Sequence, residues 1–136
     1  MEKRYTKEVK SDPDVLVDVE KFMLKIAKEI NMDTEKHNNF ILAVSEALAN
    51  SIIHGNKCDT NKKVFIEVVA DDKNIVVRLR DQGDGFNVDC IPDPTEPDNI
   101  LKDTGRGIHI MKAFADSLEY LNTGNGTETK LVFSLN

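Results

Sequence analysis

Cysteine is scarce in this chain, and long apolar runs are absent from it. The two cysteines, Cys58 and Cys90, are too few for a disulfide framework and lie in no CxxC pair or histidine cluster, so we expect free thiols rather than metal ligands. No apolar stretch approaches the roughly 20 residues that a transmembrane helix needs. The N-terminal segment also lacks the apolar region of a signal peptide. The sequence therefore predicts a cytoplasmic protein without a membrane anchor.

An excess of basic charge is also missing. The 18 Lys and Arg residues are outnumbered by 24 Asp and Glu residues, which gives a net charge of -6. Negative charge repels a phosphate backbone, so direct nucleic-acid binding is not expected. An acidic protein can still bind a polyanionic small ligand that carries a divalent cation. The chain has 136 residues, of which 40% are hydrophobic, and is expected to form a single domain over residues 1–136.

Two amphipathic helices are predicted in the first half of the chain. Apolar residues recur every three or four positions between residues 14 and 30, which is typical of a helix with one buried side. A second helix is predicted to begin at a cap formed by Asp33 or Thr34. It should continue to about His54, because Gly55 can end it.

Strands are predicted before and after these helices, most clearly in two runs rich in β-branched residues, 62–70 and 74–80. The predicted strands are residues 4–10, 62–70, 74–80, 117–122 and 128–135. Clustered prolines predict an irregular loop over residues 87–104, followed by a short helix at about 107–116. This order of elements is too irregular for a doubly wound parallel sheet. It predicts an α+β fold, a two-layer α/β sandwich whose mixed sheet carries helices on one face.

The segment SEALANSIIHGNK (residues 45–57) places three polar residues on the second predicted helix. Glu46, Asn50 and His54 are each four residues apart, so an α-helix would stack them along one stripe. The amide oxygen of Asn50 suits Mg²⁺, and Glu46 could deprotonate a hydroxyl that attacks a phosphate. Taken alone, the spacing also fits a solvated helix face. His54 fits a helix-end packing residue and is given no catalytic role.

The segment RDQGDGF (residues 80–86) leaves the end of a predicted strand. Asp81 could accept hydrogen bonds from a planar donor such as an exocyclic amine. Gly83 and Gly85 would leave room for a ligand close to the backbone. Taken alone, the segment also fits an ordinary turn at the end of a strand.

The segment DTGRGIHIMKAFAD (residues 103–116) places Arg106 between Gly105 and Gly107, directly before a predicted helix. Free N–H groups at a helix N-terminus and a guanidinium together make a site for phosphate oxygens. Taken alone, glycines before a helix are also a common connection. A further glycine-containing segment, residues 123–127, fits a hairpin turn.

In combination and in this order, the three motifs resemble those of the GHKL ATPase superfamily, which includes gyrase and the sensor histidine kinases. The matching residues are Glu46 and Asn50 (N box), Asp81, Gly83 and Gly85 (first glycine box), Gly105 and Gly107 (second glycine box), and Thr127 on a late strand. The resemblance implies a Bergerat-type ATP site. In such a site Asp81 would accept from the adenine amino group with support from Thr127, and Asn50 would bind Mg²⁺. Gly105, Arg106 and Gly107 would hold the phosphates.

Within that superfamily, the chain is similar to the bacterial anti-sigma factor serine kinases over about residues 5–135. The similarity is carried by SEALANSIIHG, the short loop and GRGIHIMKAFAD. It implies binding of a sigma factor, phosphorylation of a STAS-type anti-anti-sigma protein with Glu46 as the catalytic base, and a homodimer. A second interpretation is a nucleotide-gated binding module with little or no phosphoryl transfer. Glu46 together with Asn50 favours the kinase, because a pure binder needs no base beside the metal.

Overall fold

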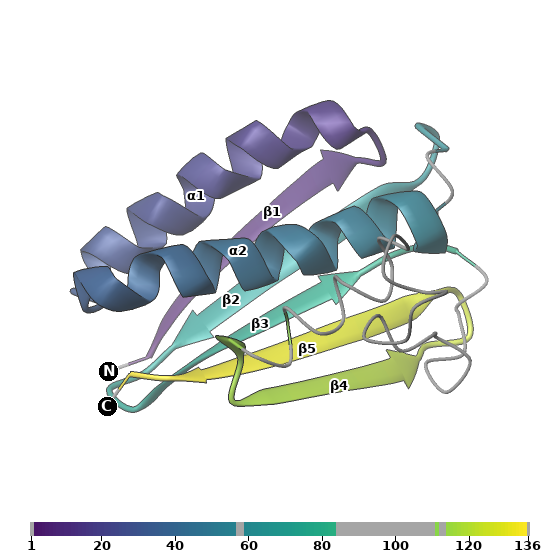
Figure 1. Cartoon of the computed structure of the whole chain (residues 1–136). Helices are drawn as coiled ribbons and strands as arrows, with labels where there is room; N and C mark the ends of the chain where they lie inside the picture. Colours follow the sequence, from purple (N-terminus) through teal and green to yellow (C-terminus); the bar gives the residue numbers. More distant parts are fainter. Residues whose placement is uncertain (1, 57–58, 84–110, 112–113, 136) are drawn as a thin grey trace, which may run out of the picture.

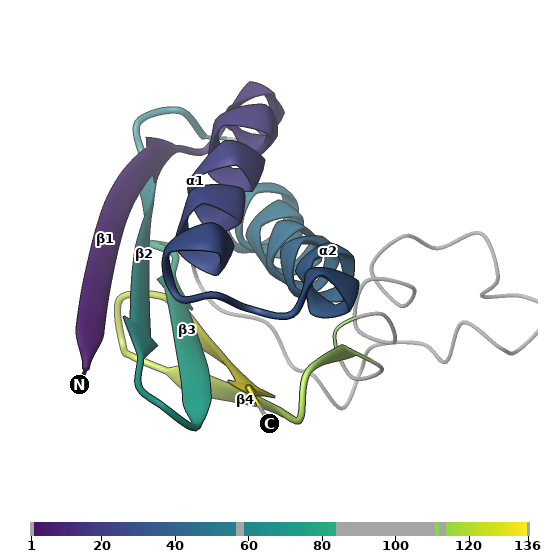
Figure 2. The same ribbon diagram turned by 90° about the vertical axis from the view of Figure 1, so that its left-hand side faces the viewer.

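Two helices lie against one face of a single sheet in the computed structural model, which describes residues 2–56, 59–83, 111 and 114–135. The helices are α1 (Leu16–Glu29) and α2 (Thr34–Asn50). They run side by side across the sheet in Figure 1, and the side view in Figure 2 places both on the same face. The predicted α+β sandwich with helices on one face is confirmed.

The sheet contains five strands, in the order β1-β2-β3-β5-β4. Their bounds are β1 (Lys3–Lys10), β2 (Lys63–Ala70), β3 (Asn74–Arg80), β4 (Ser117–Asn122) and β5 (Thr127–Ser134). All four pairings between these strands are antiparallel, so the expectation of a mixed sheet is wrong for the described residues. Alternating apolar residues indicate which face of a strand is buried, but they do not determine the direction of its neighbour.

The core lies between the helices and the inner face of the sheet. Side chains on β2 alternate between buried and more exposed positions, as a sheet covered on one face requires. Phe40 of α2 packs edge to face against Phe133 of β5, with ring centroids 5.1 Å apart. Burying a large apolar side chain of this kind stabilises a fold by about 1.5–3 kcal/mol. Among the described residues, no helix is both long and apolar enough to cross a membrane.

The two ends of α2 are set by different interactions. At its start, Oδ1 of Asp33 accepts a hydrogen bond from N of Glu35 at 3.2 Å, so Asp33 is the cap. At its end, the helix widens into a π-helical turn, Ser51–Gly55. N of Asn56 donates to O of Ser51 at 2.8 Å across this turn. The predicted four-residue stripe therefore stays α-helical only as far as Asn50.

Candidate functional site

Asp81 is the buried acid around which the candidate site is built. It follows β3 directly and is only 5% exposed. Its Oδ1 atom accepts two backbone hydrogen bonds, from N of Gly83 at 3.1 Å and from N of Thr127 at 3.0 Å. Thr127 begins β5, the strand that pairs with β3. The structure therefore brings together the first glycine motif and the threonine that the resemblance connects with it.

The second carboxylate oxygen of Asp81, Oδ2, is buried and has no hydrogen-bond partner among the described residues. Burial raises the pKa of this carboxyl, while the hydrogen bonds from Gly83 and Thr127 act in the opposite direction. A buried acceptor without a donor is costly for a fold. Such an atom is suited to a ligand that brings an N–H group to it.

Three glycines allow the backbone to pack around Asp81. A Cβ atom on Gly55 would lie 2.6 Å from Cγ of Asp81, and a Cβ on Gly126 would collide with the carbonyl of Asp81. A Cβ on Gly83 would collide with the carbonyl of Gly55. From the sequence alone, Gly55 is expected to end a helix and Gly126 to form part of a turn. Their close contact with Asp81 comes from segments far apart in the chain, so no local pattern could reveal it.

Helix α2 carries the other two predicted site residues within the described part. Glu46 is partly buried, and Asn50, the last residue of the helix, is 7% exposed. The amide nitrogen of Asn50 has no hydrogen-bond partner in the described residues. The π-helical turn leads from Asn50 to Gly55, which contacts Asp81. The N-box segment and the first glycine box therefore approach each other at the end of α2.

Asn56 is a buried residue of this region that the sequence alone does not mark as functional. It is 1% exposed, and its side chain joins segments from three other parts of the chain. Nδ2 donates to Oγ of Ser11 at 2.6 Å and to the carbonyl of Lys63 at 3.1 Å, and Oδ1 accepts from N of Gln82 at 2.7 Å. Gln82 lies between Asp81 and Gly83. No sequence signal marked Asn56, because it belongs to no motif and its partners are distant in the chain.

Part of the predicted site lies outside the described residues. This applies to Gly85 of the first glycine box, to the loop over residues 87–104, and to Gly105, Arg106 and Gly107 of the second glycine box. Most of the helix predicted at about 107–116 also lies outside them, and only its residues Met111, Phe114, Ala115 and Asp116 are described. These assignments stay predictions.

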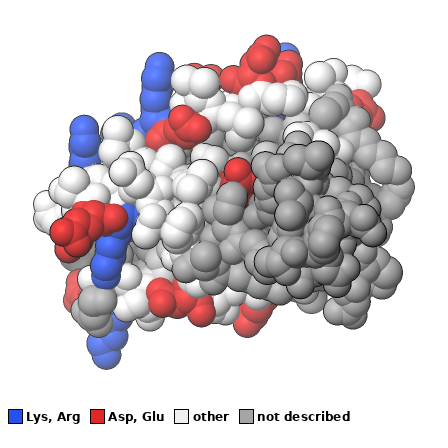
Figure 3. Space-filling model, viewed as in Figure 1, with Lys and Arg blue, Asp and Glu red and all other residues white. Residues whose placement is uncertain are grey.

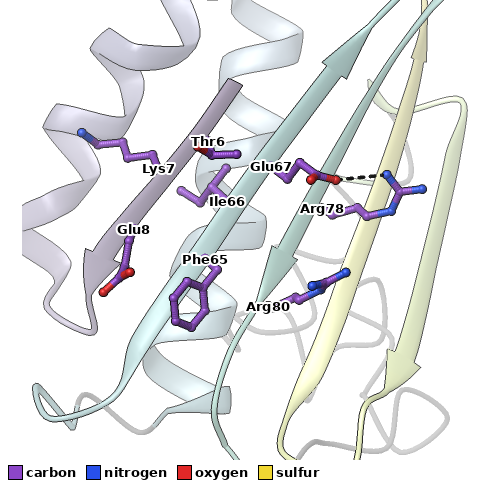
Figure 4. Close-up of a pocket in the computed structure, with 8 residues that line it drawn as sticks. All are labelled: Thr6, Lys7, Glu8, Phe65, Ile66, Glu67, Arg78 and Arg80. Atoms are coloured by element: carbon purple, nitrogen blue, oxygen red, sulfur yellow. Dashed lines mark ion pairs between the residues drawn. The ribbon is translucent and has the colours of Figure 1, made fainter. Parts of the chain in front are cut away.

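A shallow pocket of about 380 Å³ lies elsewhere, on the sheet face turned away from the helices (Figure 4). Phe65 of β2 and Arg78 and Arg80 of β3 contribute to its lining. Glu67 lies within 3.6 Å of Arg78, measured from Oε1 to Nη1. Asp81 is not among the residues lining this pocket. The pocket therefore belongs to the outer face of the sheet and not to the candidate site around Asp81.

The helix-bearing side of the molecule has charges of both signs. Figure 3 shows acidic side chains at several separate places on this face and basic side chains mainly toward one edge. In the described residues, no group of three or more His, Cys, Asp or Glu side chains is arranged to hold a metal ion.

Comparison with known proteins identifies the family. The family described as "Histidine kinase-like ATPase domain" matches residues 9–133 of this chain. This chain is a member of that family. Membership in this ATPase family implies nucleotide binding, and Oδ2 of Asp81, which has no hydrogen-bond partner among the described residues, can accept from an exocyclic amine.

Relatives of this histidine kinase-like ATPase domain include several anti-sigma F factors. The anti-sigma F factor of Clostridium perfringens is 34% identical over 105 residues, which are 74% of this chain and 74% of the relative. That of Oceanobacillus iheyensis is 39% identical over 83 residues, covering 58% of this chain and 56% of the relative. The resemblance to the anti-sigma branch of the GHKL superfamily is confirmed.

A solved structure shows the same fold. The crystal structure of the RsbU and RsbW domains of a Mycobacterium tuberculosis protein matches with a TM-score of 0.68 and 18% identity. The match covers 98% of this chain and 32% of that chain. At this level of identity the match concerns the fold alone.

Proposed function

We propose that this protein is an ATP-dependent serine/threonine protein kinase and anti-sigma factor. It would bind a sigma factor and phosphorylate a STAS-type anti-anti-sigma protein, acting in the cytoplasm and so regulating transcription. The observation that carries the proposal is the buried carboxylate of Asp81, with Oδ1 fixed by Gly83 and Thr127 and Oδ2 without a partner among the described residues. The anti-sigma F factors at 34% identity or more support the choice of partner.

The nucleotide would be held by residues from several segments. Asp81 would accept from the adenine amino group, with Thr127 supporting the same end of the ligand. Asn50 would provide an oxygen ligand for Mg²⁺, which prefers oxygen and takes the rest of its coordination from phosphates and water. The remaining proposed contacts are Gly83 and Gly85 near the nucleoside, and Gly105, Arg106 and Gly107 around the phosphates.

The transfer step assigns one catalytic role to this chain. ATP supplies the phosphoryl group, which moves to a serine or threonine hydroxyl of the partner, leaving ADP. Glu46 would take the hydroxyl proton as the general base, because it lies one helical turn from the proposed metal ligand Asn50. Its position on a regular helix fixes the direction of its side chain more firmly than a loop would.

The test is a labelled-ATP experiment with the partner that the protein binds in its own cell. Proteins retained by the purified chain would be incubated with Mg²⁺ and γ-labelled ATP, with and without the chain. Label on a serine or threonine of a small retained protein is the expected result. Capture that depends on nucleotide, without any transfer of label, would indicate a nucleotide-gated binding module instead. The absence of detectable ATP or ADP binding would overturn both.

A further inference from the structure

The side chain of Asn56 connects four parts of the chain at one end of the sheet. Asn56 itself follows the π-helical turn at the end of α2. Ser11 follows β1, Lys63 begins β2, and Gln82 follows Asp81 at the end of β3. Each carboxamide atom of Asn56 has a partner: Nδ2 donates to Ser11 and Lys63, and Oδ1 accepts from Gln82. A side chain that both donates and accepts is needed here, which a carboxylate cannot provide when ionised.

The contact with Gln82 bears directly on Asp81. Thr127 holds the backbone of Asp81 on one side, since N of Asp81 donates to O of Thr127 at 3.0 Å. Asn56 holds the next peptide group on the other side, through the 2.7 Å bond from N of Gln82. The Gln82 side chain strengthens the same connection, because its Oε1 accepts from N of Lys63 at 2.6 Å.

Asn56 also fixes the surface that faces the carboxylate. Gly55, its immediate neighbour, is the residue whose Cα lies so close to Asp81 that a Cβ would collide with it. Asn56 therefore fixes both Gly55, through the peptide bond, and the segment carrying Asp81, through Gln82. Movement of one relative to the other would change where the Oδ2 atom of Asp81 points.

We propose that Asn56 is a positioning residue for the nucleotide site, holding the segment that carries Asp81 at the end of α2 so that Oδ2 meets the adenine ring. This inference rests on the proposed function, because it takes Asp81 as the adenine acceptor. Asn56 itself would not touch the nucleotide. A shift of a binding group by about 1 Å is enough to weaken recognition strongly, so a single buried amide can have this effect.

A purely structural role for Asn56 can be separated from positioning by a matched variant. Ser11 is 0% exposed, and its Oγ donates to the carbonyl of Lys62 at 2.7 Å besides accepting from Asn56. Ser11→Ala removes hydrogen bonds from the same network and should destabilise the fold. It leaves the bond between Asn56 and N of Gln82 in place. The two sites thus differ in their connection to Asp81.

The experiment compares Asn56→Ala, Asn56→Asp and Ser11→Ala in the full chain. Affinity for adenosine and for Mg-ADP is measured by calorimetry well below the melting temperature of each variant, and amide exchange at Gln82 is followed by NMR without ligand. For Asn56→Ala we expect a loss of about tenfold for both ligands, the scale of one well-placed hydrogen bond, together with faster exchange at Gln82. Ser11→Ala should keep parental affinity and a protected Gln82 amide at reduced stability.

Asn56→Asp keeps an acceptor for Gln82 but places a carboxylate against the carbonyl of Lys63. It should therefore be less stable than the parent while binding ADP almost as well. Equal affinity in the parent and Asn56→Ala would overturn the positioning role, as would equal losses in Asn56→Ala and Ser11→Ala. If Asn56→Ala does not fold, Asn56→Asp provides the test instead. The positioning role is then overturned if Asn56→Asp binds ADP more weakly than the parent although its Gln82 amide is still protected from exchange. If the parent protein binds no nucleotide, the proposed function is refuted instead. In that case, amide exchange at Gln82 that is the same in Asn56→Ala and in the parent also refutes the role of Asn56.

Discussion

Asp81 and Thr127 hold each other through two hydrogen bonds although 46 positions separate them in the chain. N of Thr127 donates to Oδ1 of Asp81, and N of Asp81 donates to the carbonyl of Thr127, both at 3.0 Å. One oxygen of the carboxylate is thereby used to fix its own orientation. The other oxygen, Oδ2, is buried without a hydrogen-bond partner among the described residues, and we propose that it accepts from the ligand.

Asp81→Asn is expected to abolish adenine binding without destabilising the protein. The amide oxygen can replace Oδ1 as the acceptor for Gly83 and Thr127, whereas the NH₂ group would face the adenine amino group as a second donor. Loss of the buried charge should leave the free energy of unfolding at pH 7 equal to or above that of the parent. Calorimetric titration with ADP and thermal unfolding are the measurements. If Asp81→Asn binds ADP as tightly as the parent, Asp81 is not the acceptor for the adenine ring.

The raised pKa of Asp81 predicts opposite effects of pH on stability and on binding. Because burial raises the pKa of this carboxyl in the folded state above its ordinary value, protonation stabilises the folded state. The stabilisation from this group is complete at pH values below its ordinary, unfolded-state pKa and is lost as the pH rises through the folded-state pKa. ADP affinity should change the other way, since protonated Oδ2 is no longer a free acceptor. In denaturant titrations, the free energy of unfolding of the parent should fall increasingly below that of Asp81→Asn as the pH rises through the folded-state pKa of Asp81. Parallel curves would contradict the assignment.

Gly55→Ala should cost both stability and nucleotide affinity. The added methyl would lie against the carboxylate of Asp81 and displace it, and overpacking of this kind costs about 1–3 kcal/mol. Gly124→Ala is the control. It adds a methyl with no atom within 4 Å but strains a backbone with φ of 86°. Both variants should melt at lower temperatures, and only Gly55→Ala should bind ADP more weakly.

The sequence predicted the regular elements well because each depends on local spacing. The apolar repeat between residues 14 and 30 became α1, and the two β-branched runs around Asp71 became the β2–β3 hairpin. Strand direction was not accessible in this way, since an alternating pattern is the same for parallel and antiparallel neighbours. The sheet order was also hidden, because β3 pairs with β5 and not with the next strand, β4.

The candidate site was predictable only where a motif carried it. Asp81 was indicated by its own segment, RDQGDGF, and Thr127 by the resemblance, and the structure joins them by hydrogen bonds. Asn56 lies only two residues beyond His54, next to the polar stripe of α2, yet its importance comes from its contacts with Ser11 and Gln82. Contacts between distant segments leave no periodicity in a single sequence, so the fold had to be known first.

Glu46→Ala is expected to separate nucleotide binding from phosphoryl transfer. Removing a general base lowers the rate of the chemical step by about 10²–10⁴-fold, while the bound nucleotide keeps its other contacts. ADP affinity should therefore stay close to that of the parent. Glu35→Ala removes an exposed carboxylate from the first turn of the same helix and serves as the control. Equal transfer of labelled phosphate by Glu46→Ala and Glu35→Ala would show that Glu46 is not the base.

Asn50→Ala tests the metal separately from the adenine ring. Asn50 is buried, and its amide nitrogen has no hydrogen-bond partner among the described residues. Truncating its side chain to Ala should therefore remove few interactions from the protein without nucleotide. If its oxygen binds Mg²⁺, the variant should lose most of the gain in ATP affinity that Mg²⁺ gives the parent. Its affinity for adenosine, which carries no phosphate and needs no cation, should be unchanged. Calorimetry with and without Mg²⁺ distinguishes this from general damage: damage would lower adenosine affinity as well, and an unaltered Mg²⁺ effect would exclude Asn50 as the ligand.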